Sequence, residues 1–154
     1  MIRKAEKSDI PAIQSLLVQV NKVHADGRPD IFKSGGSKYT NDQLNTILAN
    51  PDTPVFVYDD QAVIKGYIFC IREETHETTN LYSKKTLYID DLCVDEAYRR
   101  EHIGKSLYEF VKVYAKDNHY DRITLHVWDL NPAARVFYEK MGMHILYTAM
   151  EQTL

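Results

Sequence analysis

The residues from Val94 to Lys105 have the types and spacing of an anion-binding turn. They follow an apolar, strand-like run that begins at Leu87, and they lead directly into a helical pattern. At the start of a helix several amide N–H groups have no partner within the helix, and the helix dipole adds partial positive charge. Arg99, Arg100 and Lys105 add full positive charges at the same place. This combination suits a pyrophosphate group.

Two common nucleotide motifs are absent. Gly104-Lys105-Ser106 matches the end of a P-loop, but Arg99 stands where that loop needs its first glycine. The Gly-x-Gly-x-x-Gly pattern of a dinucleotide-binding Rossmann turn occurs nowhere in the chain. The turn therefore points to a pyrophosphate carried by another kind of ligand.

The segment Arg99-Arg100-Glu101-His102-Ile103-Gly104 resembles motif A of the GNAT (Gcn5-related) N-acetyltransferases. In that family an Arg/Gln-x-x-Gly-x-Gly/Ala turn after a central strand binds the pyrophosphate of acetyl-CoA through its amides. His102 stands where the family usually has its first glycine, and histidine adopts left-handed backbone angles more readily than most bulky residues. The resemblance implies that the phosphates are bound by Arg99, Arg100, His102, Ile103, Gly104 and Lys105.

The segment Asn131-x-x-Ala134-x-x-x-Tyr138-Glu139-Lys140-x-Gly142 resembles motif B of the same family. This implies that Asn131 and Ala134 bind the pantetheine arm and that Tyr138 lies near the sulfur of coenzyme A. The backbone of Leu92, Cys93 and Val94 is expected to pair with the pantetheine amides as an added strand would, and one such N–H would polarise the thioester carbonyl. The two motifs occur in family order, and the order of elements matches over nearly all 154 residues.

Acetyl transfer needs a neutral amine, since an ammonium has no lone pair to attack a thioester. By resemblance to the Tyr-x-Glu-Asp stretch of polyamine acetyltransferases, Asp90 takes the place of the base, directly or through water. Neighbouring strand residues face opposite sides, so Asp91 joins Asp90 only if a bulge intervenes. Tyr138 is the candidate general acid for the departing thiolate. The alternatives are that the carboxylates pair with Arg or Lys or cap a loop, and that Tyr138 only packs on the sheet.

The acceptor is expected at the connection after the first helix and at the second helix. A set of acidic residues would favour a cationic amine there; it comprises Asp26, Asp30, Asp42, Glu73, Glu74 and Glu77. Arg28 would instead suit a carboxylate, as in an amino acid or a peptide.

The hydrophobic pattern predicts the order strand, helix, helix, three strands, helix, strand, helix, strand. Ser8-Asp9 caps the first helix, Thr40 with Gln43 forms a capping box for the second, and Asn131 caps the last. The final strand is expected at residues 144–150, and the stretch from Arg72 to Lys85 as an exposed connection or a frayed strand end. The fold class is therefore α/β (α+β), a GNAT fold with a mixed, mostly antiparallel sheet of about six or seven strands and four helices.

Length and composition predict one N-acetyltransferase domain over residues 1–154. Cys70 and Cys93 lie in apolar runs and are expected to be buried thiols, and no Cys/His group has zinc-ligand spacing, so no metal is expected. The net charge of −3 argues against a nucleic-acid partner, and no apolar run is long enough to cross a membrane, which favours a cytoplasmic protein. The oligomeric state stays open, with a homodimer among the options.

The leading prediction is an acetyl-CoA-dependent N-acetyltransferase that acts on a primary amine of a small molecule or peptide in a ternary complex. The alternative is an acetyl-CoA-binding sensor or regulatory module without catalysis, which His102 in place of glycine motivates. A third option is transfer of a longer acyl group, decided by the space at Tyr88, Leu92 and Trp128.

Overall fold

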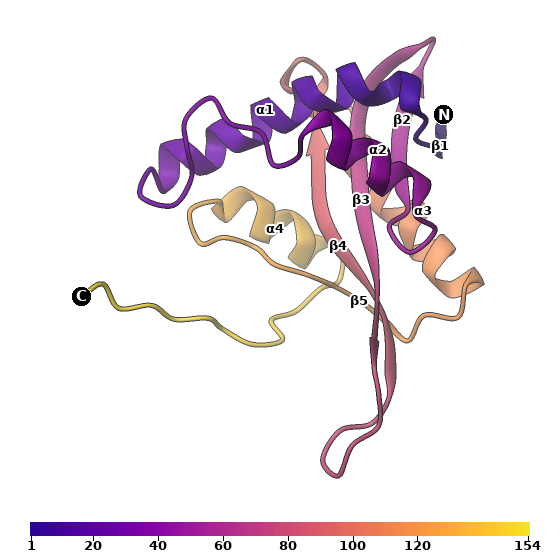
Figure 1. The fold of residues 1–154 in the computed structure, drawn as a ribbon, viewed down its shortest axis with the longest axis vertical. Coiled ribbons are helices and arrows are strands. Elements are labelled where there is room, and N and C mark those ends of the chain that lie inside the picture. Colours follow the sequence, from indigo (N-terminus) through magenta and orange to yellow (C-terminus); the bar gives the residue numbers. More distant parts are fainter.

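The computed structural model describes all 154 residues. The element order agrees with the sequence prediction from the first strand to the last helix (Figure 1). The elements are β1 (Ile2–Lys4), α1 (Ile10–Gly27), α2 (Asn41–Ala49), β2 (Val55–Asp60), β3 (Val63–Thr75), β4 (Lys84–Val94), α3 (Ile103–Asp117), β5 (Arg122–Leu125) and α4 (Pro132–Lys140), with single 3-10 turns at Lys7–Asp9 and Glu96–Tyr98.

The five strands form one sheet in the order β1-β2-β3-β4-β5. Every neighbouring pair is antiparallel except β4 and β5, which are parallel. The two parallel strands are joined by a crossover through α3, as parallel pairing requires. The mixed sheet and the four helices confirm the predicted fold class.

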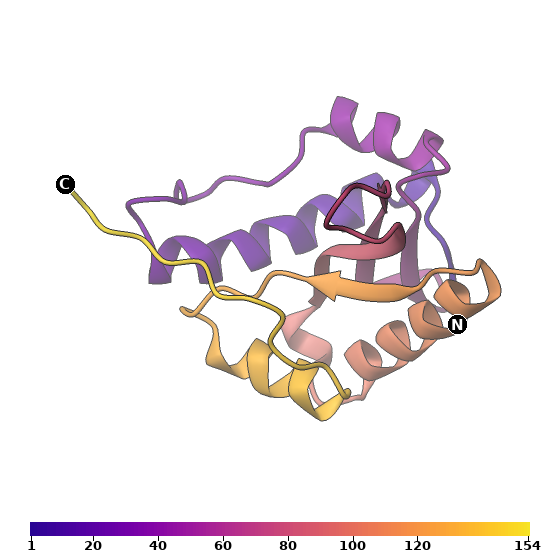
Figure 2. The same ribbon diagram turned by 90° about the horizontal axis from the view of Figure 1, so that it is seen from below.

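Helices cover both faces of the sheet, as the view from below shows (Figure 2). On one face α1 and α2 pack over a core that includes Ile13, Leu17 and Tyr67. On the other face α3 packs over a second core with Ile68, Leu107 and Val111, and side chains of α4 lie against it. Both thiols are free and buried, as predicted.

Two of the three predicted helix caps are present. Gln43 and Thr40 exchange side-chain and backbone hydrogen bonds at the start of α2. The Asn131 side chain accepts a hydrogen bond from the amide of Ala134, 3.2 Å away. The third prediction was wrong in detail, because Asp9 accepts from the Glu6 amide and from Arg3 and does not cap α1.

A bulge interrupts β4 at the two acidic residues. Phe69 on β3 lies opposite Asp91, but the next residue, Cys70, lies opposite Ile89, so Asp90 has no partner. Ile89 therefore packs into the core under α3, whereas Cys93 packs into the core under α1 and α2. In an unbroken strand these two side chains would face the same side.

The predicted sixth strand does not form, and the expectation of six or seven strands was wrong. Residues 144–154 have no helical or strand structure and pair with no neighbour. An alternating apolar pattern shows that a segment is able to pair, but a ladder also needs a partner edge within reach. The segment instead leaves the body of the molecule (Figure 1).

Candidate functional site

The turn before α3 is built on two left-handed residues, neither of them glycine. Arg100 has a φ of 73° and His102 a φ of 60°. The unusual backbone at His102, where the motif usually has glycine, is therefore adopted by a histidine, as the sequence suggested. The turn therefore forms without a glycine at this position.

The amides of this turn are free to bind a ligand. None of the backbone N–H groups from Arg99 to Lys105 donates a hydrogen bond within the protein. The first internal bond of α3 runs from Ser106 to the carbonyl of His102, at 2.9 Å. Seven consecutive donors at the positive end of a 15-residue helix are the kind of group that can bind an anion.

The cations of the turn are also free. Arg99, Arg100 and Lys105 are exposed and form no ion pair with another side chain. The side chain of Ile103 is buried in the core under α3, so it anchors the turn. At Gly66 on β3 an added Cβ would lie 2.8 Å from the carbonyl oxygen of Cys93. A glycine there lets β3 and β4 approach closely below the first turn of α3.

The edge of β4 beside this turn is open. β5 pairs with β4 only from Thr86 to Ile89, so residues 90–94 have no neighbour on that side. The Asp95 amide donates to the Lys65 carbonyl on the β3 side, at 2.9 Å. Since alternate amides of a strand point to opposite edges, those of Leu92 and Val94 face the open side, while that of Cys93 faces β3. This slot can accept an extended, amide-containing chain.

Tyr138 lies on α4, which borders the open slot. Burial, followed by the negative charge of Asp91 and the nearby Tyr108, raises the pKa of its hydroxyl well above the usual value. The hydroxyl makes no hydrogen bond to the protein. Every fully buried polar side-chain atom in the structure has a partner, so this oxygen is not fully buried. The Tyr138 oxygen is therefore both protonated at neutral pH and reachable from outside.

Asn131 starts the same helix. Its side-chain oxygen is used in capping the Ala134 amide, but its NH₂ group has no partner in the protein. Asn131 and Ala134 are both partly exposed. The two residues stand together at one end of α4, and the Asn131 amide retains donors for a ligand.

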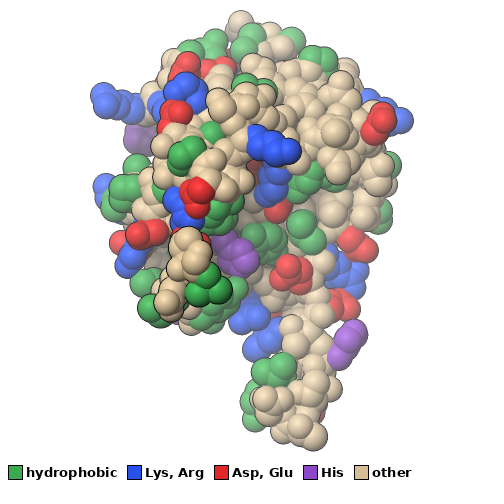
Figure 3. Space-filling model, turned by 60° about the vertical axis from the view of Figure 1, so that its left-hand side comes forward, with side chains coloured by type: hydrophobic (Ala, Val, Ile, Leu, Met, Phe, Trp, Pro, Cys, Tyr) green, Lys and Arg blue, Asp and Glu red, His purple; other side chains and the backbone are tan.

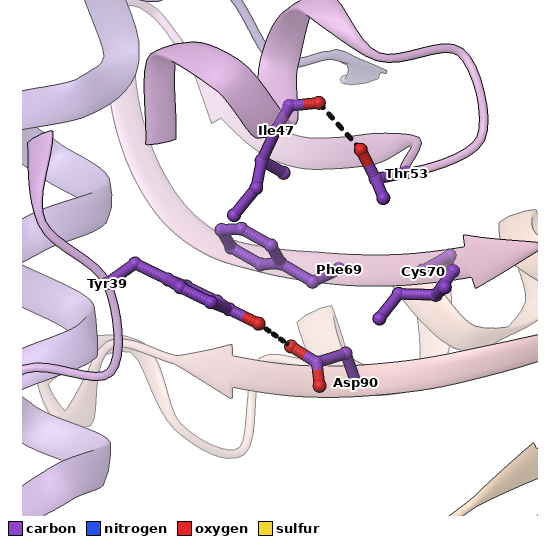
Figure 4. A pocket seen from close by; sticks show the side chains of 7 residues that line it. Tyr39, Ile47, Thr53, Phe69, Cys70 and Asp90 are labelled. Atoms are coloured by element: carbon purple, nitrogen blue, oxygen red, sulfur yellow. Dashed lines mark hydrogen bonds between the residues drawn. The ribbon is translucent and has the colours of Figure 1, made fainter. Parts of the chain in front are cut away.

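Asp90 is held by residues from a distant part of the chain (Figure 4). Its carboxylate accepts a hydrogen bond from the Tyr39 hydroxyl at 2.5 Å and forms an ion pair with the Lys38 ammonium at 2.9 Å. The side chain of Asp90 is 11% exposed, against 43% for Lys38. A cavity of about 30 Å³, large enough for one water molecule, lies beside it and is lined in part by Tyr39, Phe69 and Asp90.

Asp91 lies on the same side of the sheet because of the bulge. Its carboxylate accepts a hydrogen bond from the Tyr67 hydroxyl at 2.7 Å. Burial is the main reason why its pKa is raised. The two carboxylates thus have different surroundings: Asp90 faces a cation, whereas Asp91 is enclosed among tyrosines.

The chain matches the model of the Acetyltransferase (GNAT) family over residues 18–143. It belongs to the GNAT acetyltransferase family. Among curated relatives, it is 34% identical over 92 residues to the probable N-acetyltransferase san of Drosophila melanogaster, which covers 59% of this chain and 46% of that protein. It is 40% identical over 67 residues to N-alpha-acetyltransferase 50 of Danio rerio, covering 43% of this chain and 40% of that protein. The matched stretches thus span less than half the length of either relative.

A solved structure resembles this GNAT chain over its whole length. The tetramutant of the BH1408 protein from Bacillus halodurans has a TM-score of 0.96 and 32% sequence identity, with 100% of this chain and 99% of that one covered. Members of the family generally use acetyl-CoA as co-substrate. The free amides, the three free cations and the open edge of β4 fit its diphosphate and its pantetheine amides.

Sequence reasoning missed a chain of polar aromatic residues that joins β4 to the C-terminal segment. The Tyr88 hydroxyl lies 3.3 Å from Nδ1 of His126, and Nε2 of His126 lies 2.9 Å from the Tyr147 hydroxyl. The three residues come from β4, from the end of β5 and from the C-terminal segment. A histidine ring with a hydroxyl group at each nitrogen can pass a proton between the two hydroxyl groups. The three residues are far apart in the sequence, and only folding brings them together.

Three of the six acidic residues expected around the acceptor form ion pairs with neighbouring basic side chains. Asp26 pairs with Lys22, Asp30 with Arg28, and Glu74 with Arg72. Positive and negative side chains alternate on the side from which the C-terminal segment projects (Figure 3). No group of three His, Cys, Asp or Glu side chains is arranged to hold a metal ion, and no helix is long and apolar enough to cross a membrane.

Proposed function

We propose that this chain transfers the acetyl group of acetyl-CoA to an amine by direct attack in a ternary complex. The observation that carries the proposal is the continuity of two unpaired surfaces, the amides from Arg99 to Lys105 and the open edge of β4. Arg99, Arg100, His102, Ile103, Gly104 and Lys105 hold the diphosphate, while Leu92, Cys93, Val94, Asn131 and Ala134 hold the pantetheine arm. Bound acetyl-CoA supplies the acetyl group as an activated thioester.

Asp90 binds and deprotonates the acceptor amine in this scheme. The Lys38 ammonium, paired with the Asp90 carboxylate at 2.9 Å, has the charge and size of a protonated alkyl amine. An acceptor takes the place of Lys38, and the proton then passes to Asp90 directly or through water in the adjoining cavity. The free amine attacks the thioester carbonyl, whose oxygen is stabilised by an amide of the open β4 edge.

Tyr138 assists the leaving sulfur. Its raised pKa keeps the phenol protonated, so it donates a hydrogen bond to the thiolate of coenzyme A as the carbon–sulfur bond breaks. A thiol has a pKa of about 8.5, well below that of this phenol, so the hydrogen bond stabilises the thiolate without complete proton transfer.

The acceptor is an amine on a small molecule or a peptide. The name of the Danio rerio relative identifies that protein as an N-alpha-acetyltransferase, which makes peptide amino termini the first acceptors to test. Aromatic side chains near Lys38 support a peptide acceptor, because they offer an apolar surface for its side chains. Phe32 packs edge-on against Trp128 with ring centroids 5.1 Å apart, and His24, which is close to Lys38, packs against Phe32 at 4.8 Å.

The test is acetyl-CoA turnover against a panel of peptides and small amines. We expect Asp90→Asn and Tyr138→Phe to lower turnover, while Tyr82→Phe, on the exposed end of the β3–β4 hairpin, leaves it unchanged. Turnover that neither site substitution alters would remove the residue assignments.

A sensor without catalysis is the second candidate. The ion pair between Lys38 and Asp90 favours a sensor, because the charge of the Asp90 carboxylate is already balanced without an acceptor amine. A sensor would be stabilised against heat by acetyl-CoA but would acetylate nothing in the panel. Any specific acetylated product excludes this candidate.

A further inference from the structure

The turn before α3 includes one acidic residue among its free donors. Glu101 lies between Arg100 and His102, and its amide is one of the seven that donate no hydrogen bond within the protein. Its carboxylate has the same sign of charge as a diphosphate, so it would weaken the binding of that group if nothing balanced it. The charge of Glu101 is balanced by a residue of another strand.

That residue is Lys65, on β3. Its ammonium lies 3.5 Å from the Glu101 carboxylate and 2.8 Å from the Asp60 carboxylate. The same ammonium lies 4.3 Å from the centre of the Tyr98 ring, directly before the turn, which is the geometry of a cation–π contact. The Lys65 side chain is only 14% exposed, so water screens these contacts less than it screens a pair on the open surface.

The backbone of Lys65 adds a further contact. Its carbonyl accepts a hydrogen bond from the Asp95 amide at 2.9 Å, and the Asp95 carbonyl accepts one from the Tyr98 amide at 2.9 Å. Lys65 therefore contacts the connection between β4 and α3 at three places, which are Asp95, Tyr98 and Glu101. One residue of β3 fixes the path of the chain into the turn.

An irregularity in β3 directs the Lys65 side chain to this place. Gly66 and Ile64 pair with neighbouring residues of β2, so Lys65 between them has no partner there. In an unbroken strand Ile64 and Ile68 would face the same side, but Ile64 packs against the core under α1 and α2 and Ile68 lies in the core under α3. The extra residue turns Lys65 to the α3 side, where Tyr98 packs against that second core.

We propose that Lys65 is a positioning residue for acetyl-CoA. It holds the turn in the shape that presents its amides and keeps the charge of Glu101 neutralised, so that the diphosphate meets only donors and cations. The inference rests on the proposed binding of acetyl-CoA to this turn. Lys65 itself does not touch the coenzyme in this scheme, because its ammonium is already engaged by two carboxylates and a ring.

Calorimetric titration of acetyl-CoA into the full chain tests the proposal. Lys65→Met removes the ammonium and keeps most of the length of the side chain. We expect the Kd for acetyl-CoA to rise about 5- to 10-fold, the effect of losing a partly shielded ion pair together with a cation–π contact. With an accepted amine, the kcat at saturating acetyl-CoA should stay the same. Lys65→Arg keeps a cation that can stack on Tyr98 and should restore the affinity to within a factor of about 2.

Glu101→Gln separates the charge of Glu101 from the other contacts of Lys65. Lys65→Met should weaken acetyl-CoA binding less in a Glu101→Gln chain than in the unaltered chain, by a factor of about 2 or more. Lys85→Met is the matched control, because the Lys85 ammonium also lies over a ring, 4.4 Å from the centre of Tyr120, but at the end of β4 far from the turn. It should leave the Kd unchanged.

The outcomes separate this inference from the proposed function. An unaltered chain that does not bind acetyl-CoA would overturn both. A chain that binds acetyl-CoA equally well with and without the Lys65 ammonium would overturn the role of Lys65 alone, as would equal losses with Glu101 and with Gln at that position. Thermal unfolding followed by circular dichroism verifies that each variant is folded.

Discussion

At Tyr138 a single hydroxyl combines two properties that a hydrogen-bond donor to a leaving sulfur needs. A phenol keeps its proton in the neutral range, and burial with the nearby charge of Asp91 raises the pKa of this one further. It also has no partner in the protein, so it loses no hydrogen bond when a ligand arrives. Burial alone would be expected of a packing residue; the free hydroxyl is what distinguishes a donor.

Tyr138→Phe removes the hydroxyl and keeps the ring. We expect kcat to fall about 100-fold, the lower end of what a positioned proton donor contributes. The KM for acetyl-CoA should change little, because the residues proposed to bind its phosphates lie in the turn before α3 and not on α4. Steady-state kinetics with an accepted amine measures both, and an unchanged kcat would assign Tyr138 to packing alone.

Lys38 competes with the acceptor in the proposed scheme. Lys38→Gln removes the charge that neutralises Asp90 and leaves most of the side chain in place. A partly exposed pair contributes up to about 1 kcal/mol, so we expect the KM for a cationic amine to fall by a factor of about 2 to 5. Lys33→Gln, in the same loop and in no ion pair, is the control. A higher KM in Lys38→Gln would mean that Lys38 helps to bind the acceptor.

The sequence indicated some of these residues and not others, for a physical reason. Asp90, Asn131 and Tyr138 belong to local motifs whose spacing is visible in the chain. Lys38 lies 52 residues from Asp90, and Tyr147 lies 21 residues from His126, so these contacts exist only after folding. The sequence around His126 gives no sign of the Tyr88 and Tyr147 hydroxyl groups that lie beside its ring in the fold.

At the level of elements, the turn before α3 stores backbone strain at Arg100 and His102, as the chain also does at Gln61, Ala62 and His119. The left-handed conformation costs a residue with a side chain roughly 1–2 kcal/mol, and glycine escapes that cost but has a more flexible unfolded state. We expect His102→Gly to raise the free energy of unfolding by about 0.5–1 kcal/mol. Chemical denaturation measures it.

Glu101→Gly provides the comparison for that prediction. Glu101 lies between Arg100 and His102 but has no positive φ. A glycine there gains nothing in the folded state and should lower stability by about 0.5–1 kcal/mol. Equal effects at both positions would show that the turn is not strained.

Elements with strong local signals were predictable, and those that depend on a partner were not. The capping box of α2 and the cap of α4 follow from residues three apart, which contact each other as soon as the turn forms. The bulge in β4 depends on how β3 is aligned with it. The sequence could therefore predict only that Asp90 and Asp91 would face the same side of the sheet if a bulge formed. The prediction of a final strand was wrong for the same reason. The apolar pattern of residues 144–150 carries no information about which strand edge could pair with the segment.

At the scale of the whole molecule, Arg3 ties the first strand to two other parts of the chain. It forms ion pairs with Asp9 at 2.7 Å, before α1, and with Asp59 at 2.8 Å, at the end of β2. The hydrogen bonds from Arg3 lower the pKa of Asp9, which burial alone would raise. The pair therefore stabilises the fold above the ordinary aspartate range and ceases to do so as the pH falls through the lowered pKa.

Asp9→Asn should show that dependence. At neutral pH we expect it to lower the free energy of unfolding by about 1–3 kcal/mol, the range for hydrogen bonds to charged groups. The difference from the unaltered protein should shrink as the pH falls below 3.8, the usual aspartate value, because Asp9 itself then becomes protonated. Asp26→Asn, in an exposed pair with Lys22, should change stability little. A difference that stays constant with pH would contradict the assignment.

The long β3–β4 hairpin divides the chain between the two helical layers. Its tip, residues 76–83, extends beyond the rest of the sheet (Figure 1), with Tyr82 84% exposed. A protease that cuts there would separate a fragment with α1 and α2 from one with α3 and α4. Both cores draw residues from both fragments, since Cys93 belongs to the first core and Ile68 and Cys70 belong to the second. We expect the nicked fragments to co-elute and to part only in denaturant; fragments that separate in plain buffer would contradict this. The gene could accordingly be split at this tip into two cistrons whose products assemble by complementation.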